Sequence, residues 1–247
     1  MGHIITDLKE AFRRGNVYIQ LIFINVGVFV ITTLIGILLQ LFNRSAAGIF
    51  ELLALPASFT RFAWQPWSIF TYMFMHAGFL HILFNMLTLW CVGPVLERMM
   101  GHWPYLALYV LSGLGGGAGL MVWAVCSPSG WMTAAYGASG ALFGLFAAIL
   151  VVYRRIGIDI RSMLIWMLIN FLMPVITPGI AWQAHAGGFI VGGVLAWLLV
   201  TGLHAFRGKS LTWRTTVYGI TVFVVVVAII VGCNAGNPLM HMSLLYQ

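Results

Sequence analysis

Long runs of apolar residues, separated by short polar segments, recur along the whole chain. A helix needs about 20 apolar residues to cross a hydrocarbon core about 30 Å thick. This criterion predicts an all-α polytopic membrane protein. Its seven expected spans are Val17–Phe42, Gly78–Leu96, Tyr105–Val125, Ser139–Tyr153, Met163–Ile176, Trp182–Leu203 and Thr215–Gly232.

The longest stretch outside these spans, residues 43–77, is rich in aromatic side chains. Trp and Tyr are enriched where the bilayer meets water. We therefore expect this segment to lie in the membrane interface rather than in free solution.

Composition supports the same class. Hydrophobic residues make up 62% of the 247 residues and charged residues only 7%, whereas soluble domains carry about 25% charged residues. The three cysteines form no CxxC spacing and, being odd in number, no disulfide framework. We expect them to pack as small buried apolar side chains, and we expect no cofactor.

The basic residues predict an orientation. Of the twelve Lys and Arg residues, only Arg44 and Arg61 fall in connections on one side of the predicted spans; the other ten fall on the opposite side. The positive-inside rule places those ten in the cytoplasm, with the N-terminus inside and the C-terminus outside. The net charge of +7 is then explained by topology, and no nucleic-acid partner is needed.

Two polar side chains stand in apolar spans beside glycines. Ser139 lies in Gly137-Ala138-Ser139-Gly140, and His185 begins the string His185-Ala186-Gly187-Gly188. Serine in a membrane helix is often a packing residue, and histidine can be a hydrogen-bonded core residue. Together, however, they offer a nucleophile and a general base with a suitable unperturbed pKa.

The glycines indicate how the two side chains could meet. Gly140 and Gly144 share one face of the Ser139 helix, and Gly188 and Gly192 share a face of the other helix with His185. Small residues four apart let membrane helices approach closely. The spacing therefore predicts a contact that brings the imidazole within reach of the Ser139 hydroxyl.

Two further polar residues share a face of the second span. His81 and Asn85 are four residues apart, so both could donate to one oxyanion; an ordinary interhelical hydrogen bond is the alternative. His76 is interpreted as structural. A metal site built from His76, His81 and His185 is disfavoured, because the sequence places no acidic ligand beside them.

The acidic residues narrow the function classes. The five carboxylates are Asp7, Glu10, Glu51, Glu97 and Asp159, and none falls within a predicted span. This excludes an aspartyl intramembrane protease and an intramembrane Ser-His-Asp triad. It also counts against an ion-coupled transporter, which usually carries an intramembrane carboxylate.

Five motifs in this order resemble the rhomboid intramembrane serine proteases, over roughly residues 17–206. They are Met75-His76, His81-Ile82-Leu83-Phe84-Asn85, Leu96-Glu97-Arg98, Gly137-Ala138-Ser139-Gly140, and Ala184-His185 followed by Gly188 and Gly192. The resemblance implies a six-helix rhomboid-like core at residues 1–206. A basic linker, a seventh C-terminal transmembrane helix and a short outer tail would occupy residues 207–247.

The resemblance also implies roles. Ser139 would be the nucleophile and His185 its base, while His81, Asn85 and the Ser139 backbone N–H would bind the oxyanion. His76, Gly137, Gly140, Gly188, Gly192 and Phe143 would be structural residues near the site. Substrates would be membrane-anchored proteins cut in or near their transmembrane segments, in a lipid bilayer and with no cofactor or metal.

Two positions depart from the family pattern. Ser68 follows Trp67 where many members have Arg, and Arg61 is a possible substitute. Phe143 stands where some members have Tyr, so that ring can still pack on His185 but loses its hydroxyl.

Three functions follow for comparison. The first is a serine endopeptidase, expected in a bacterial plasma membrane. The second is a catalytically inactive rhomboid-like protein that binds membrane clients, although such relatives usually lack the serine or the histidine. The third is a small transporter or channel. The sequence indicates no oligomeric state.

Overall fold

The computed structural model describes residues 15–42, 44–45, 47–56, 65–127, 130–161, 163–165, 167–168 and 181–235. Six helices in these ranges are long and apolar enough to cross a membrane. They are α2 (Val17–Leu41), α6 (Phe79–Met100), α7 (His102–Cys126), α8 (Ser139–Ile156), α10 (Trp182–Val200) and α11 (Leu211–Ala235). The prediction of an all-α polytopic membrane protein is confirmed. The expected span Met163–Ile176 lies mostly outside the described residues.

Helix boundaries differ from the predictions by a few residues. The second span does not end at Leu96 but continues to Met100, with Pro94 inside the helix. It ends at Gly101, whose φ of +87° suits a residue without a side chain. The last span begins at Leu211, four residues earlier than predicted, because Thr212 and Trp213 extend the helix beyond its purely apolar part.

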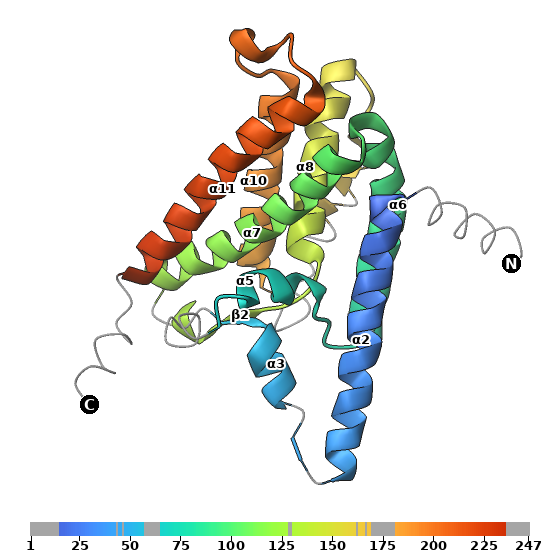
Figure 1. The fold of residues 1–247 in the computed structure, drawn as a ribbon, viewed down its shortest axis with the longest axis vertical. Helices are drawn as coiled ribbons and strands as arrows, with labels where there is room; N and C mark the ends of the chain where they lie inside the picture. The colour runs from blue at the N-terminus through green and yellow to red at the C-terminus, as the bar shows by residue number, and fades with distance from the viewer. Residues whose placement is uncertain are drawn as a thin grey trace, which may run out of the picture.

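The connections contain short elements that hydropathy did not predict. α3 (Ala47–Leu53), β1 (Leu55–Pro56), α5 (Ser68–Thr71) and η1 (Tyr72–Phe74) follow α2, while η2 (Gly130–Met132) and β2 (Ala134–Ala135) precede α8. β1 pairs antiparallel with β2, with Leu55 opposite Ala135. The pairing satisfies backbone groups of two connections that meet at one end of the bundle, where Figure 1 shows α3, α5 and β2.

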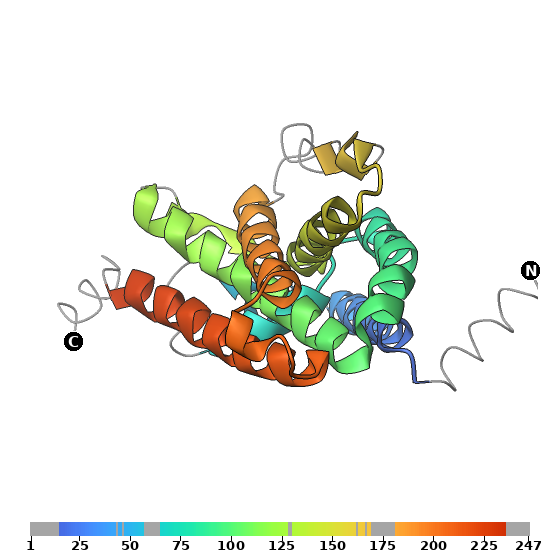
Figure 2. The same cartoon turned by 90° about the horizontal axis from the view of Figure 1, so that it is seen from above.

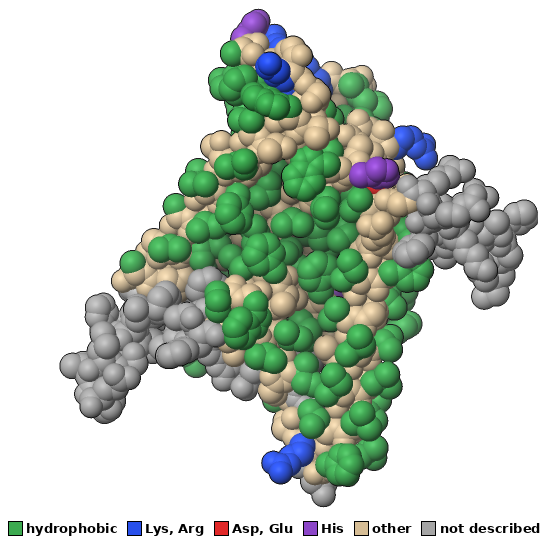
Figure 3. Space-filling model, viewed as in Figure 1, with side chains coloured by type: hydrophobic (Ala, Val, Ile, Leu, Met, Phe, Trp, Pro, Cys, Tyr) green, Lys and Arg blue, Asp and Glu red, His purple; other side chains and the backbone are tan. Residues whose placement is uncertain are grey.

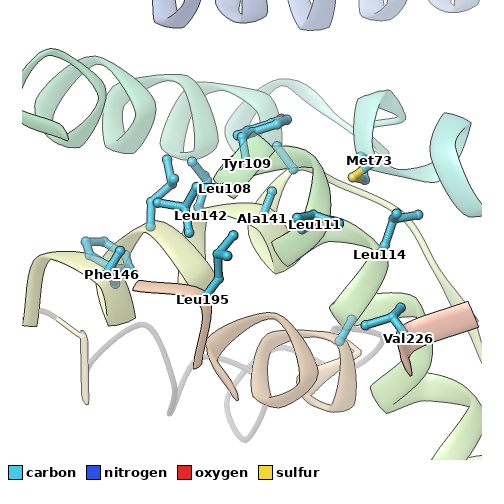
Figure 4. Close-up of a cluster of buried hydrophobic side chains, with 14 of the residues drawn as sticks. Met73, Leu108, Tyr109, Leu111, Leu114, Ala141, Leu142, Phe146, Leu195 and Val226 are labelled. Carbon is cyan, nitrogen blue, oxygen red and sulfur yellow. The ribbon is translucent and has the colours of Figure 1, made fainter. Parts of the chain in front are cut away.

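The centre of the bundle is formed by α7, α8 and α10, with α10 packed against both of the others (Figure 2). Leu108, Tyr109, Leu111 and Leu114 from α7 lie near Leu142 and Phe146 from α8 and Leu195 from α10 (Figure 4). These side chains belong to one buried apolar cluster. This cluster is the scaffold on which the polar residues stand.

The C-terminal helix α11 runs parallel to α7 along its length (Figure 1). The Trp103 indole N–H donates to Thr216 Oγ1 at 3.2 Å, and the Asn234 amide contacts Met121 Sδ at 3.5 Å. Both pairs have the same sequence offset of 113 residues. At the far end of α10, η3 (His204–Phe206) begins the turn that joins it to α11.

The surface suits a bilayer. Apolar side chains dominate the middle of the view in Figure 3, and Lys and Arg gather towards its two ends. Along α2, side chains such as Phe23, Ile31 and Leu38 are about half exposed. The prediction of buried cysteines was wrong: Cys91 and Cys126 are exposed and Cys233 is half-buried, because their helix faces point outward where lipid can cover them.

The beginning of α2 depends on a carboxylate from another helix. The N-cap residue Asn16 makes no side-chain cap, and the free N–H groups of Val17 and Tyr18 donate to the Glu97 carboxylate at 2.7 and 2.9 Å. His102 Nδ1 also contacts this carboxylate. Glu97 is only 6% exposed, and a negative charge at a helix N-terminus is favourable.

Glu97→Ala should therefore destabilise the protein. Hydrogen bonds to a charged group contribute about 1.5–3 kcal/mol each, so we expect a loss of about 3 kcal/mol. Denaturant titration in mixed micelles measures it. Asp159→Ala removes a carboxylate whose side chain is 72% exposed and should change the free energy of unfolding little; equal effects of the two substitutions would contradict the capping role.

Candidate active site

Ser139 is the first residue of α8 and follows a tight turn. Gly137 has a φ of +115° in that turn, a conformation that side-chain-bearing residues rarely adopt. Its N–H donates to the Tyr72 carbonyl at 2.8 Å. The turn places Ser139 at the helix N-terminus, where backbone N–H groups lack helical partners.

His185 lies in the first turn of α10 and faces Ser139. The distance from His185 Nε2 to Ser139 Oγ is 2.8 Å. The Phe143 ring stacks on the imidazole, with centroids 4.4 Å apart and planes at 16°. His185 is 6% exposed; its Nδ1 has no hydrogen-bond partner among the described residues. Among the described residues, stacking on Phe143 is therefore the contact that fixes the plane of the His185 ring.

Glycines explain why the two helices come so close. A Cβ on Gly188 would lie 2.0 Å from the Gly140 carbonyl oxygen, and one on Gly192 would lie 2.4 Å from Gly144 Cα. Any side chain at these positions would separate α8 from α10. The backbone contact therefore sets the distance between Ser139 and His185.

The same contact has a third member, α7, which the sequence analysis did not identify. A Cβ on Gly144 would meet Ser112 Oγ at 2.0 Å, and one on Gly116 would lie 2.9 Å from the Ala184 carbonyl oxygen. The signal was present in the sequence, because Gly113, Gly115, Gly116, Gly117 and Gly119 crowd the middle of that span. We call this three-helix contact the glycine junction.

Tyr72 is a second residue that the sequence analysis missed. Its hydroxyl donates to the Gly113 carbonyl at 2.5 Å, and its own carbonyl accepts the Gly137 N–H. The side chain is 1% exposed. Tyr72 thereby joins the connection before α6 both to α7 and to the turn that carries Ser139.

His81 borders the same turn. A Cβ on Gly137 would lie 2.8 Å from His81 Nε2 and 3.8 Å from Ser139 Oγ, so the His81 ring lies beside the approach to Ser139. The His76 ring packs edge-on against His81 with centroids 5.0 Å apart. His76 lies before α6, and burial, together with the neighbouring His81, lowers its pKa to about 4; it is neutral near pH 7.

Asn85 is one turn further along α6. Its amide donates to the His81 carbonyl at 2.8 Å, and the residue is 6% exposed. An Asn amide carries two hydrogens, so one donor remains for another partner. The structure shows Asn85 beside His81 but no hydrogen bond from it to Ser139.

The connection that contains Ser68 is held by other residues. The Trp67 indole N–H donates to the Leu52 carbonyl at 3.0 Å, and Thr71 Oγ1 donates to the Leu53 carbonyl at 2.7 Å. Ser68 itself is fully buried. Arg61, the possible substitute, lies outside the described residues.

Comparisons with known proteins agree on one family. A family model described as Rhomboid domain matches residues 63–202. "Putative rhomboid protease YdcA" of Bacillus subtilis is 37% identical over 139 residues, which cover 54% of this chain and 67% of the relative. "RHOMBOID-like protein 5" of Arabidopsis thaliana is 33% identical over 143 residues, covering 55% of this chain and 45% of the relative.

A third relative, "Rhomboid protease GluP" of Bacillus subtilis, is 33% identical over 138 residues, covering 53% of this chain and 25% of its own length. The aligned part therefore spans less than half of the plant relative and a quarter of this one. The match includes Ser139 and His185 within residues 63–202.

Gly188→Ala tests the glycine junction. The new Cβ would meet a backbone carbonyl, which cannot rotate away, so we expect a loss of at least about 1–3 kcal/mol from overpacking. Thermal unfolding in detergent measures it. In Gly27→Ala on α2 nothing lies within 4 Å of the new Cβ, so that variant should keep or slightly raise stability; a tolerated Gly188→Ala would refute the close approach.

Proposed function

Because the chain belongs to the rhomboid family, we propose that it is an intramembrane serine endopeptidase that uses a Ser139–His185 dyad. The observation that carries the proposal is the 2.8 Å contact between Ser139 Oγ and His185 Nε2. Named relatives described as proteases support the reaction class.

The chemistry follows from that contact. His185 with its proton on Nδ1 accepts the Ser139 hydroxyl proton at Nε2 while Oγ attacks a peptide carbonyl carbon. The imidazolium then returns this proton to the leaving amine, and the C–N bond breaks to leave an acyl-enzyme. Water repeats the sequence to release the acid. Without a carboxylate partner, the Phe143 stack keeps the ring aligned.

The negative charge that forms on the oxygen of the tetrahedral intermediate must be stabilised by hydrogen-bond donors. Ser139 begins α8, so its backbone N–H and the positive end of the helix dipole favour an anion there. His81 borders the Ser139 turn and supplies a second donor. Asn85 supplies a third if its free amide hydrogen turns toward the oxygen, because its other hydrogen bonds His81.

The proposed substrates are membrane-anchored proteins cut in or near a transmembrane segment. Except in its last turn, the backbone carbonyls of a spanning helix are hydrogen-bonded within the helix. Such a helix must unwind locally before a nucleophile can reach one of them. A substrate segment that is easily unwound should therefore be preferred; nucleic acid has no role in this chemistry.

We propose the matching topology for the whole chain. A rhomboid-like core occupies residues 1–206, and residues 207–247 hold a basic linker, the seventh span and an outer tail. The described cations Arg154, Arg155, Arg207 and Lys209 lie near the ends of α8 and α10 away from Ser139. The positive-inside rule then puts Ser139 near the outer face of a bacterial plasma membrane.

Ser139→Ala should abolish cleavage of a single-span model substrate in liposomes. Loss of a serine nucleophile costs up to about 10⁶-fold in turnover, so we expect at least about 10³-fold. The wild-type protein should also be labelled by a fluorophosphonate probe. Ser210→Ala, which removes an exposed hydroxyl at the opposite end of the bundle, should retain both properties.

The outcomes separate the candidate functions. Labelling of Ser139 without cleavage would mean that the substrate offered was unsuitable. Absence of both labelling and cleavage from well-folded wild-type protein would reject the protease and favour an inactive client-binding member of the family.

His81→Ala tests the oxyanion donors. Removing one such donor costs about 10²–10³-fold in kcat, with a smaller change in KM because the donor acts on charge that develops in the transition state. Steady-state cleavage in one detergent measures both constants. Phe84→Ala alters a 51% exposed side chain on the same helix and serves as control; a pure KM effect in His81→Ala would assign that residue to substrate binding.

A further inference from the structure

An apolar groove lies between α7, α10 and α11, on a side of the bundle that the catalytic proposal does not use. The groove has a volume of about 310 Å³. α10 and α11 are joined at one end by residues 201–210 and diverge toward the other end (Figure 1). Among the residues that the structure describes, the divergence leaves part of one face of α7 open, with Val122 44% exposed.

The lining is almost entirely apolar. Ala118, Val122, Ala186, Ile190 and Ile229 form walls from all three helices, and Gly115, Gly119 and Gly187 contribute backbone. Of the lining residues that the structure describes, Gln183 alone carries an amide. Water has little to bind in such a groove, whereas hydrocarbon fits its chemistry.

The length of the groove matches one leaflet. Along α7 its lining runs from Gly115 to Cys126, which is about 16 Å at 1.5 Å per residue. Half of a hydrocarbon core about 30 Å thick is about 15 Å. The groove thus extends from near the middle of the membrane to the end of the bundle where Ser139 lies.

Its outer end carries the side chains expected where hydrocarbon meets headgroups. Trp123 and Trp182 pack edge-on with centroids 5.1 Å apart, and both line the groove. Trp182 is the first residue of α10, and Cys126 is the last of α7. Tryptophan prefers this boundary because its ring is apolar and its N–H is polar.

Size selects the occupant. One turn of helix, about 5.4 Å long and 10–12 Å across with side chains, fills on the order of 500 Å³. The groove, at about 310 Å³ over its whole length, cannot enclose a helix of this diameter, which could lay only one face over it. A single extended hydrocarbon chain is narrow enough and long enough.

We propose that the groove between α7, α10 and α11 holds one acyl chain of a phospholipid from the leaflet nearest Ser139. At about 100° per residue, Ala186, Gly187 and Ile190 lie about 100–200° around α10 from His185. The acyl chain therefore packs on the side of α10 away from the dyad and supports the helix that carries His185. The inference does not depend on proteolysis.

The test is photo-crosslinking to the intact protein in vesicles. The vesicles contain phosphatidylethanolamine and phosphatidylglycerol, with a trace of phosphatidylethanolamine that carries a diazirine within one acyl chain. Mass spectrometry should find adducts concentrated on residues 115–126 and 182–191. Adducts spread evenly over the exposed faces of all helices, α2 included, would overturn the proposal.

Two variants sharpen the result. Ala186→Phe places a ring in the groove and should abolish those adducts, while Ala228→Phe, an exposed α11 position outside the lining, should keep them. If Ala186→Phe unfolds at a lower temperature than wild type, Ile190→Trp replaces it as the filling variant. Adducts that persist in the filled variant, or cross-links to another protein segment in the groove, would reject the acyl chain as occupant.

Discussion

The contact on which the rest of the structure depends is the glycine junction of α7, α8 and α10. Within a bilayer, apolar side chains gain little by leaving lipid, so helices associate through close packing and hydrogen bonds. Gly140, Gly144, Gly188 and Gly192 let backbones meet at distances no side chain would allow. A methyl group here would change the separation of two helices and with it the geometry of everything at their ends.

The polar site is a consequence of that rigidity. Ser139 and His185 each stand in the first turn of a helix that starts at the junction, so their 2.8 Å contact is set by backbone packing rather than by flexible loops. Tyr72 also fixes the turn that precedes Ser139. Its hydroxyl donates to the Gly113 carbonyl on α7, and its own carbonyl accepts the Gly137 N–H. A two-residue site without an acidic partner needs such fixed positions, because nothing polar among the described residues orients His185 Nδ1.

Hydropathy predicted the spans because a bilayer requires long apolar helices, and six lie within a few residues of expectation. The spacing of Gly188 and Gly192 correctly indicated a close approach to α8. Single-helix periodicity could not show that α7 completes the junction, because three-way contacts depend on crossing geometry. Nor could it find the Glu97 cap or the β1–β2 pair, since both join segments about 80 residues apart and have no local pattern.

The helices pack more closely in one part of the bundle than in another, and the difference has a physical cause. Near Ser139 and His185, glycines bring the backbones of α7, α8 and α10 so close together that an added Cβ would clash. Along α11 the parallel contact with α7 is closed at Trp103 and Asn234, yet α10 and α11 diverge and leave an apolar groove between them. In water such a gap would collapse or fill with solvent; in a membrane, hydrocarbon can occupy it at little cost because it is chemically equivalent to the side chains that line it. A membrane protein can therefore pack its helices tightly where backbone geometry matters, while lipid fills the gaps between helices elsewhere.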